Sequence, residues 1–135
     1  MSGSSFWSIQ QALVAKLRAD ATLMSRITGV FDEIKQNTTF PYVTVGEFTS
    51  RPWRTQTRFG EEVTVTLHIW SRYKGFKESF QILDDVNRVL ADQDLNVTGW
   101  DAVTCYYEFS DAYNDPDGIT RHVPVRFRIQ IQKGV

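Results

Sequence analysis

The residues best suited to binding a partner are concentrated in one short stretch, SRPWRTQTRFGEE, residues 50–62. Cationic and aromatic side chains gather there: Arg51, Trp53, Arg54, Arg58 and Phe59. An indole among guanidinium groups can stack on a nucleic-acid base while the cations hold phosphates. The same combination can anchor a protein interface. The stretch therefore predicts a binding surface, and the choice between these partners depends on the rest of the chain.

The charge balance favours a protein partner over nucleic acid. The chain has 15 Lys and Arg residues against 16 Asp and Glu, a formal net charge of -1. Proteins that bind duplex DNA usually carry a clear basic excess, because neutralised phosphates supply much of the affinity. A small nucleic-acid-binding module stays open as an alternative, since Arg126, Arg128 and Lys133 form a basic stripe near the C-terminus. We expect these residues to pair with acidic neighbours, such as those of the second long helix.

Other aromatic residues also favour a protein interface. Aromatic residues make up 13% of the chain, and several fall in predicted loops or on predicted polar faces: Trp70, Tyr73, Trp100, Tyr106 and Tyr113. Interface cores are enriched in Trp, Tyr and Arg. The sequence therefore predicts a subunit of a larger assembly.

The residues that could catalyse a reaction or bind a metal lack suitable neighbours. His68 and His122 have no Cys or carboxylate at metal-ligand spacing, and we expect both to be ordinary surface residues. Cys105, the single cysteine, falls on an apolar strand face and is expected to be a small buried hydrophobe. Asp84 and Asp85 diverge by about 100° on a helix, which predicts a solvated acidic face. We expect no enzyme activity, no cofactor and no metal.

The stretch NDPDG, residues 114–118, predicts a tight turn, because Asp, Pro and Gly each favour turn conformations. A calcium loop is not expected, because the first and last ligand positions of the EF-hand pattern carry unsuitable residues. Asp115 and Asp117 are a second candidate contact with a partner.

Two helices and two strand hairpins are expected to position these groups. Apolar spacing predicts helices over about residues 5–19 and 74–91, and a shorter helical turn between them that Gly29 closes. Alternating apolar residues predict four strands, at about 41–49, 61–72, 97–109 and 119–132, with a short one at 30–34. In the third of these strands one face is expected to carry Val103, Cys105, Tyr107 and Phe109.

The order helix, strand hairpin, helix, strand hairpin predicts an α+β fold. We expect an antiparallel sheet of four to five strands with both main helices on one face. The arginine–tryptophan stretch then lies at the tip of the first hairpin, and residues 114–118 form the turn of the second.

The length of 135 residues corresponds to one domain. We expect a single domain over residues 1–135, with residues 1–4 flexible. The sequence has no run of about 18 apolar residues that could cross a membrane, and its beginning does not have the pattern of a secretory signal. A single cysteine excludes an internal disulfide and favours a reducing compartment.

Four stretches in this order resemble the tail completion, or tail terminator, family of long-tailed phages and gene transfer particles, whose members join heads to tails. They are FPYVTVGE, TVTLHIWSR, the amphipathic helix that follows, and NDPDGITRHVPVRFRI. Together with the first helix, the resemblance covers nearly the whole chain.

The resemblance implies a ring, usually of six copies, that caps the head-proximal end of the tail tube. Such a ring stops further addition of tube subunits and offers a docking face to the connector of the head and neck. DNA would pass through its lumen without specific recognition, which suits a chain without strong positive charge. The protein would be assembled in the host cytoplasm and reside at the head–tail joint of a virion or phage-like particle. Another ring component of the neck is the alternative within this class.

Within this interpretation, the stretch from Arg51 to Phe59 is an assembly arm. Trp53 would anchor the contact, and the arginines would pair with carboxylates of the partner.

Overall fold

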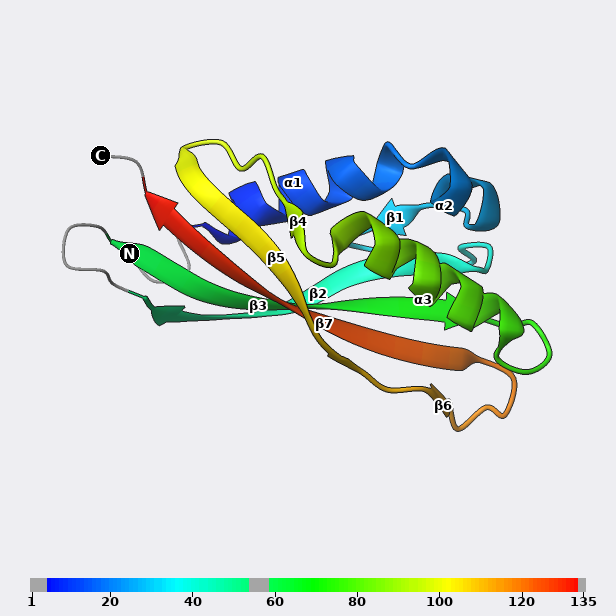
Figure 1. Cartoon of the computed structure of the whole chain (residues 1–135). Helices are drawn as coiled ribbons and strands as arrows, with labels where there is room; N and C mark the ends of the chain where they lie inside the picture. The colour runs from blue at the N-terminus through cyan, green and yellow to red at the C-terminus, as the bar shows by residue number, and fades with distance from the viewer. Residues whose placement is uncertain (1–4, 54–58, 134–135) are drawn as a thin grey trace.

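Helices cover one side of a strongly curled sheet in the computed structural model, which describes residues 5–53 and 59–133 (Figure 1). The helices are α1 (Phe6–Arg18), α2 (Ala21–Arg26) and α3 (Lys77–Leu90). The strands are β1 (Val30–Phe31), β2 (Tyr42–Pro52), β3 (Gly60–Ser71), β4 (Gln93–Asp94), β5 (Trp100–Ser110), β6 (Tyr113–Asn114) and β7 (Arg121–Lys133). Among these residues no helix combines the length and apolar character that crossing a membrane requires.

The strand order of the sheet is β1-β2-β3-β7-β5-β4, and β6 pairs with β7 beside this path. All pairs are antiparallel except β1 with β2. The predicted α+β fold, with both main helices on one face, is confirmed. The sheet is mixed and has seven strands in the described residues instead of four or five. The additional strands β4 and β6 have two residues each, too few to show a period of two.

Both predicted hairpins form, and they join through a central pairing of β3 with β7. The first hairpin runs from the pair Tyr42–Trp70 to the pair Pro52–Glu61. At the end where residues 54–58 connect the two strands, the backbone N–H of Trp53 donates to the carbonyl oxygen of Gly60 at 2.9 Å. The arginine–tryptophan stretch therefore starts and ends where two long strands meet, as predicted.

A bulge in β5 changes which side chains of this strand face the core and which face outward. The register with β7 shifts between Tyr107 and Phe109, so Phe109 pairs with Arg126 of the outer face. The guanidinium carbon of Arg126 lies 4.7 Å from the centroid of the Phe109 ring. The expectation that Phe109 shares a face with Cys105 is wrong, because the extra residue in the bulge moves every later side chain to the other face.

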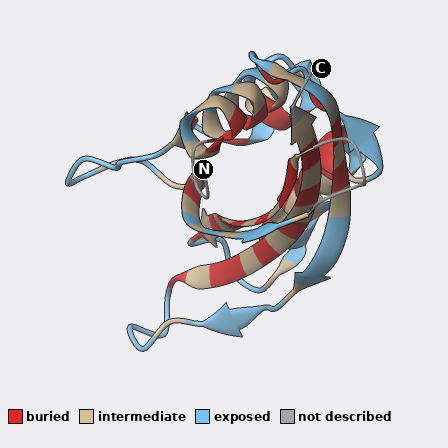
Figure 2. Ribbon diagram, turned by 90° about the vertical axis from the view of Figure 1, so that its left-hand side faces the viewer, coloured by how far each residue is buried: buried red, intermediate tan, exposed pale blue. Residues whose placement is uncertain are grey.

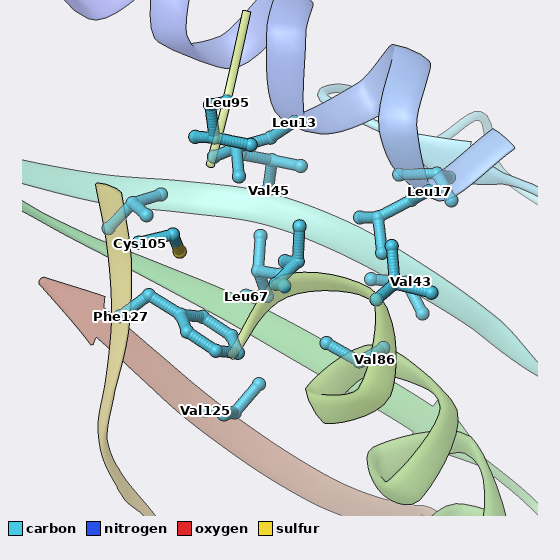
Figure 3. Close-up of a cluster of buried hydrophobic side chains, with 14 of the residues drawn as sticks. Leu13, Leu17, Val43, Val45, Leu67, Val86, Leu95, Cys105, Val125 and Phe127 are labelled. Atoms are coloured by element: carbon cyan, nitrogen blue, oxygen red, sulfur yellow. The ribbon is translucent and has the colours of Figure 1, made fainter. Parts of the chain in front are cut away.

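The core fills the space between the helices and the concave face of the sheet (Figures 2 and 3). Its fully buried side chains include Ile9, Leu13 and Leu17 of α1, Ile82, Val86 and Leu90 of α3, and Leu67, Cys105, Val125 and Phe127 of the sheet. Burying a side chain such as Phe127 contributes about 1.5–3 kcal/mol. This continuous core holds the sheet and the helices together as one rigid unit.

Gly29 has a different role from the one predicted. Helix α2 ends at Arg26 with Ile27 extended, and Gly29 is not among the residues with positive φ. A Cβ at Gly29 would lie 2.5 Å from Cζ of Phe31. The glycine therefore permits the close approach of an aromatic ring and does not form a left-handed helix end.

Candidate assembly interface

The ends of β2 and β3 present the described part of the predicted arm. Arg51 is exposed, and its Nε lies 3.8 Å from Oε1 of Glu62, the residue opposite it on β3. Trp53 and Phe59 are half-buried. Arg54 and Arg58 lie outside the described residues. An exposed ion pair of this length contributes little to stability, so the Arg51 guanidinium is available to a partner.

Gly60 fixes the base of this arm by allowing three strands to converge. A Cβ at Gly60 would lie 2.5 Å from the carbonyl oxygen of Trp53 and 2.9 Å from that of Ile131. It would also lie 3.0 Å from the Trp53 ring. Because no side chain fits there without displacing backbone, the close packing of these strands requires a glycine at the start of β3.

A buried carboxylate lies next to this glycine. Glu61 is only 1% exposed, and it accepts a hydrogen bond from the Ser50 hydroxyl. A buried carboxylate is costly unless it is hydrogen-bonded, so this contact ties β2 to β3 at the arm base. We did not single out Glu61 from the sequence. Its position two residues before Val63 puts it on the inward face, and that spacing is a usable signal.

The turn at residues 114–118 is held by its own hydrogen bonds. The Asp117 carboxylate accepts from the backbone N–H groups of Ile119 and Thr120, both at 2.8 Å, and from the Thr120 hydroxyl at 2.7 Å. These bonds, the one from the Thr120 backbone first, lower the pKa of Asp117 to about 2. Gly118 takes a positive φ of 72°. Asp117 is therefore engaged in shaping the turn, and a contact between this turn and a partner stays a prediction.

The two histidines are not ordinary surface residues, contrary to expectation. His68 Nδ1 lies 2.7 Å from His122 Nε2, and the other nitrogen of His68 contacts the Glu47 carboxylate. His122 Nδ1 lies 3.9 Å from Oδ1 of Asp115. These contacts connect the β2 bulge with the turn after β6 across the outer face of the sheet.

Aromatic rings cover His122 and explain its burial. The Trp70 ring stacks on it with a centroid distance of 3.9 Å and an angle of 7°. The Tyr113 ring lies nearly perpendicular to the His122 ring, with 4.9 Å between the two centroids. Burial, and then the neighbouring His68, lower the pKa of His122. We expected Trp70 and Tyr113 at an interface with a partner. Part of the surface of each ring instead packs against His122. This cluster could not be predicted from the sequence, because it depends on the pairing of β3 with β7.

The predicted acidic face of α3 divides into two parts. Asp84 is exposed as expected, but Asp85 is buried and its Oδ2 lies 2.8 Å from Nε of Arg26. Arg88 connects α3 to Asp20 with hydrogen bonds of 2.9 and 2.7 Å. Asp85 therefore joins α3 to α2, an arrangement that helical spacing alone does not reveal.

Arg126 and Arg128 of the basic stripe contact residues of β5, whereas we expected acidic partners on the second long helix. Arg126 lies 3.6 Å from the Glu108 carboxylate as well as over Phe109. The Arg128 guanidinium lies 5.4 Å from the Tyr106 ring centroid. These contacts reduce the positive charge that this face offers to nucleic acid.

Cys105 is fully buried as predicted, and burial raises the pKa of its thiol to about 12. A protonated, inaccessible thiol is a poor nucleophile. Within residues 5–53 and 59–133, no three His, Cys, Asp or Glu side chains gather in a way that could hold a metal ion.

The fold is a curled sheet covered by helices on one side, and the ends of β2 and β3 carry the exposed Arg51 beside the half-buried Trp53. The chain belongs to the tail completion protein gp17 family, whose sequence model matches residues 11–132. The predicted resemblance is thereby confirmed. As a member of this family the protein is a structural component of the virion tail or neck, and it is not an enzyme.

Individual relatives agree with this assignment. The chain is 29% identical over 124 residues to the tail completion protein gp17 of Bacillus phage SPP1, covering 90% of this chain and 92% of that protein. The solved structure of SPP1 gp17 matches with a TM-score of 0.63 and 26% identity over 94% of each chain. A chain in the virion of a native gene transfer agent particle has the same fold, with a TM-score of 0.89 at 21% identity, over 97% of this chain and 99% of that one.

Proposed function

We propose that the protein forms a ring on the head-proximal end of the tail tube, where it ends tube polymerisation and provides the docking face for the neck. The observation that carries this proposal is the match of residues 11–132 to the tail completion family. Strand β2 ends and strand β3 begins at one end of the curled sheet (Figure 1), and the arginine–tryptophan stretch joins them in the sequence.

The ring has six copies and is built from one repeated contact in which a patch on one copy meets a different patch on the next. Its partners are the tail tube protein and the connector of the head and neck, at the head–tail joint. DNA passes through the lumen without being recognised, and the formal net charge of -1 suits a conduit that must not retain DNA. The ring is assembled in the host cytoplasm.

The arm from Arg51 to Phe59 makes an assembly contact. Trp53 anchors it, and Arg51, Arg54 and Arg58 pair with carboxylates of the partner. Tryptophan and arginine are the residues that most often dominate interface energies. The close backbone packing at Gly60 and the buried Glu61 support this role, because they show that the base of the arm is tightly packed.

Polymerisation of the purified tube protein from the same particle tests this function. Adding the wild-type protein should stop elongation, and electron microscopy should show a ring on one end of each tube. The variant Trp53→Ala/Arg54→Ala should fold normally by circular dichroism and fail to stop elongation. Undiminished tube growth in the presence of the wild-type protein would refute the capping role. Full capping by the double variant would instead refute the role of the arm.

A further inference from the structure

Four side chains form a row across the outer face of the sheet, from the bulge of β2 to the turn that follows β6. Glu47 contacts Nε2 of His68, and Nδ1 of His68 lies 2.7 Å from Nε2 of His122. Nδ1 of His122 lies 3.9 Å from Oδ1 of Asp115. The first two contacts are hydrogen bonds, whereas 3.9 Å is too long for one. The row is therefore hydrogen-bonded at its Glu47 end and interrupted at its Asp115 end.

The number of protons explains which contact is interrupted. Each of the three contacts needs one N–H group between its two partners, because a carboxylate and a bare ring nitrogen are both acceptors. Two neutral imidazole rings carry only two N–H groups. The two short contacts use both of them, so a bare Nδ1 of His122 faces the carboxylate of Asp115.

A third proton would supply the missing donor. Wherever the positive charge then resides within the histidine pair, all three contacts contain an N–H group, and Nδ1 of His122 can donate to Asp115. We propose that uptake of one proton by the histidine pair joins Asp115 to His122 and fastens the turn at residues 114–118 to the outer face of the sheet. The row is a pH-sensitive switch in the position of this turn.

His122 cannot move far to make the new contact. It is only 8% exposed, and the Trp70 ring stacks on it with a centroid distance of 3.9 Å. The Tyr113 ring packs against it from another side, at 4.9 Å between centroids. The hydrogen bond to His68 holds one nitrogen in place. Closing the gap therefore requires a movement of Asp115.

The turn around Asp115 can follow such a movement as one unit. The Asp115 N–H donates to the carbonyl oxygen of Thr120 at 2.9 Å, and the Asp115 carbonyl oxygen accepts from the N–H of Gly118 at 2.9 Å. Residues 116–119 are exposed, so no core packing opposes the movement. A charge-assisted hydrogen bond has a length of about 2.7–2.9 Å, so Asp115 would approach His122 by about 1 Å.

The groups that surround His122 determine the pH at which the switch operates. The titratable groups that face it come from three strands and the turn: Glu47 of β2, His68 of β3, Tyr113 of β6 and Asp115. Burial lowers the pKa of His122 below its ordinary value of 6.5, and His68 lowers it further, whereas Asp115 and Glu47 raise it. Arg72, which follows β3, lies 3.9 Å from Asp117 of the same turn. Proton uptake is therefore expected in mild acid.

NMR spectroscopy of the free chain tests the switch between about pH 8 and about pH 5, the range in which histidines titrate. The His122 ring nitrogens and the backbone amides of residues 115–118 are followed together. In the wild type the turn amides should shift with the same midpoint as His122. A crystal structure in mild acid should show the distance from Nδ1 of His122 to Asp115 shortened to about 2.8 Å.

The variant Asp115→Asn should uncouple the turn from the titration. Its side-chain amide can donate to the bare Nδ1 of His122, so the contact no longer needs a proton. The turn amides should then stay constant while His122 still titrates, with a lower midpoint because a neighbouring carboxylate is lost. The control is Asp111→Asn, which neutralises an exposed carboxylate before β6 and should behave like the wild type.

Three results would overturn the switch. The turn amides of the wild type could stay constant while His122 titrates, His122 could stay neutral until the chain unfolds, or the turn response could be equal in wild type and Asp115→Asn. Circular dichroism at each pH checks that the chains remain folded. The inference goes beyond the proposed ring and does not depend on it, because the test uses the free chain and no capping assay.

Discussion

His122 illustrates how buried polar chemistry is arranged on the outer face of the sheet. The Glu47 carboxylate can only accept a hydrogen bond, so His68 must donate to it through Nε2. His68 Nδ1 then accepts from Nε2–H of His122, which leaves Nδ1 of His122 without a proton in the neutral pair. A further proton would enter on the side that faces Asp115, at 3.9 Å.

This arrangement predicts a stability that falls in mild acid. The pKa of His122 is lowered from its ordinary value of 6.5, chiefly by burial. The unfolded chain therefore binds more protons than the folded chain just below pH 6.5, so the free energy of unfolding decreases as the pH falls through this window. Urea denaturation at about pH 8 and about pH 5 should show the decrease in the wild type, and a smaller one in His122→Gln. An equal decrease in the variant would show that His122 is not responsible.

At the scale of elements, the base of the arm depends on one glycine. Gly60→Ala would place a Cβ 2.5 Å from one carbonyl oxygen and 2.9 Å from another. Backbone of β2 or β7 would have to move, and we expect a loss of roughly 1–3 kcal/mol in the free energy of unfolding. Chemical denaturation measures this loss.

Gly46→Ala is the matched control, because it is also a glycine in the first hairpin. An added Cβ there meets only the His68 ring, at 3.8 Å or more, which is an ordinary contact. We expect Gly46→Ala to be neutral or slightly stabilising. Equal effects of the two substitutions would contradict the steric role of Gly60.

The long elements could be predicted because each has a clear local period. Helices α1 and α3, the four long strands and both hairpins follow from the spacing of apolar residues and from turn residues. The central pairing of β3 with β7, the bulge before Phe109 and the two-residue strands could not be predicted. They depend on partners far away in the sequence or are too short to have a period.

The same rule decides which features of the candidate interface could be predicted from the sequence. The arm could be predicted because its arginines and tryptophan are neighbours in the sequence. The histidine pair could not, because it brings together His68 of β3 and His122 of β7. The burial of Asp85 was missed for the same reason, since its partner Arg26 belongs to α2.

The whole molecule has two different ends. Strand β2 ends and strand β3 begins at one end of the curled sheet, and α3 begins toward the other end (Figure 1). Copies that meet through two different surfaces assemble head to tail, and they form a closed ring where the rotation between copies closes. This geometry fits the proposal that the protein ends a tube and leaves a face for the neck.

Tail length in particles produced without this protein tests the central claim most directly, by negative-stain electron microscopy. We expect overlong or variable tails that are not attached to filled heads. Tails of normal length that are detached from heads would instead indicate another ring component of the neck. Tails of normal length on infectious particles would contradict the proposed function.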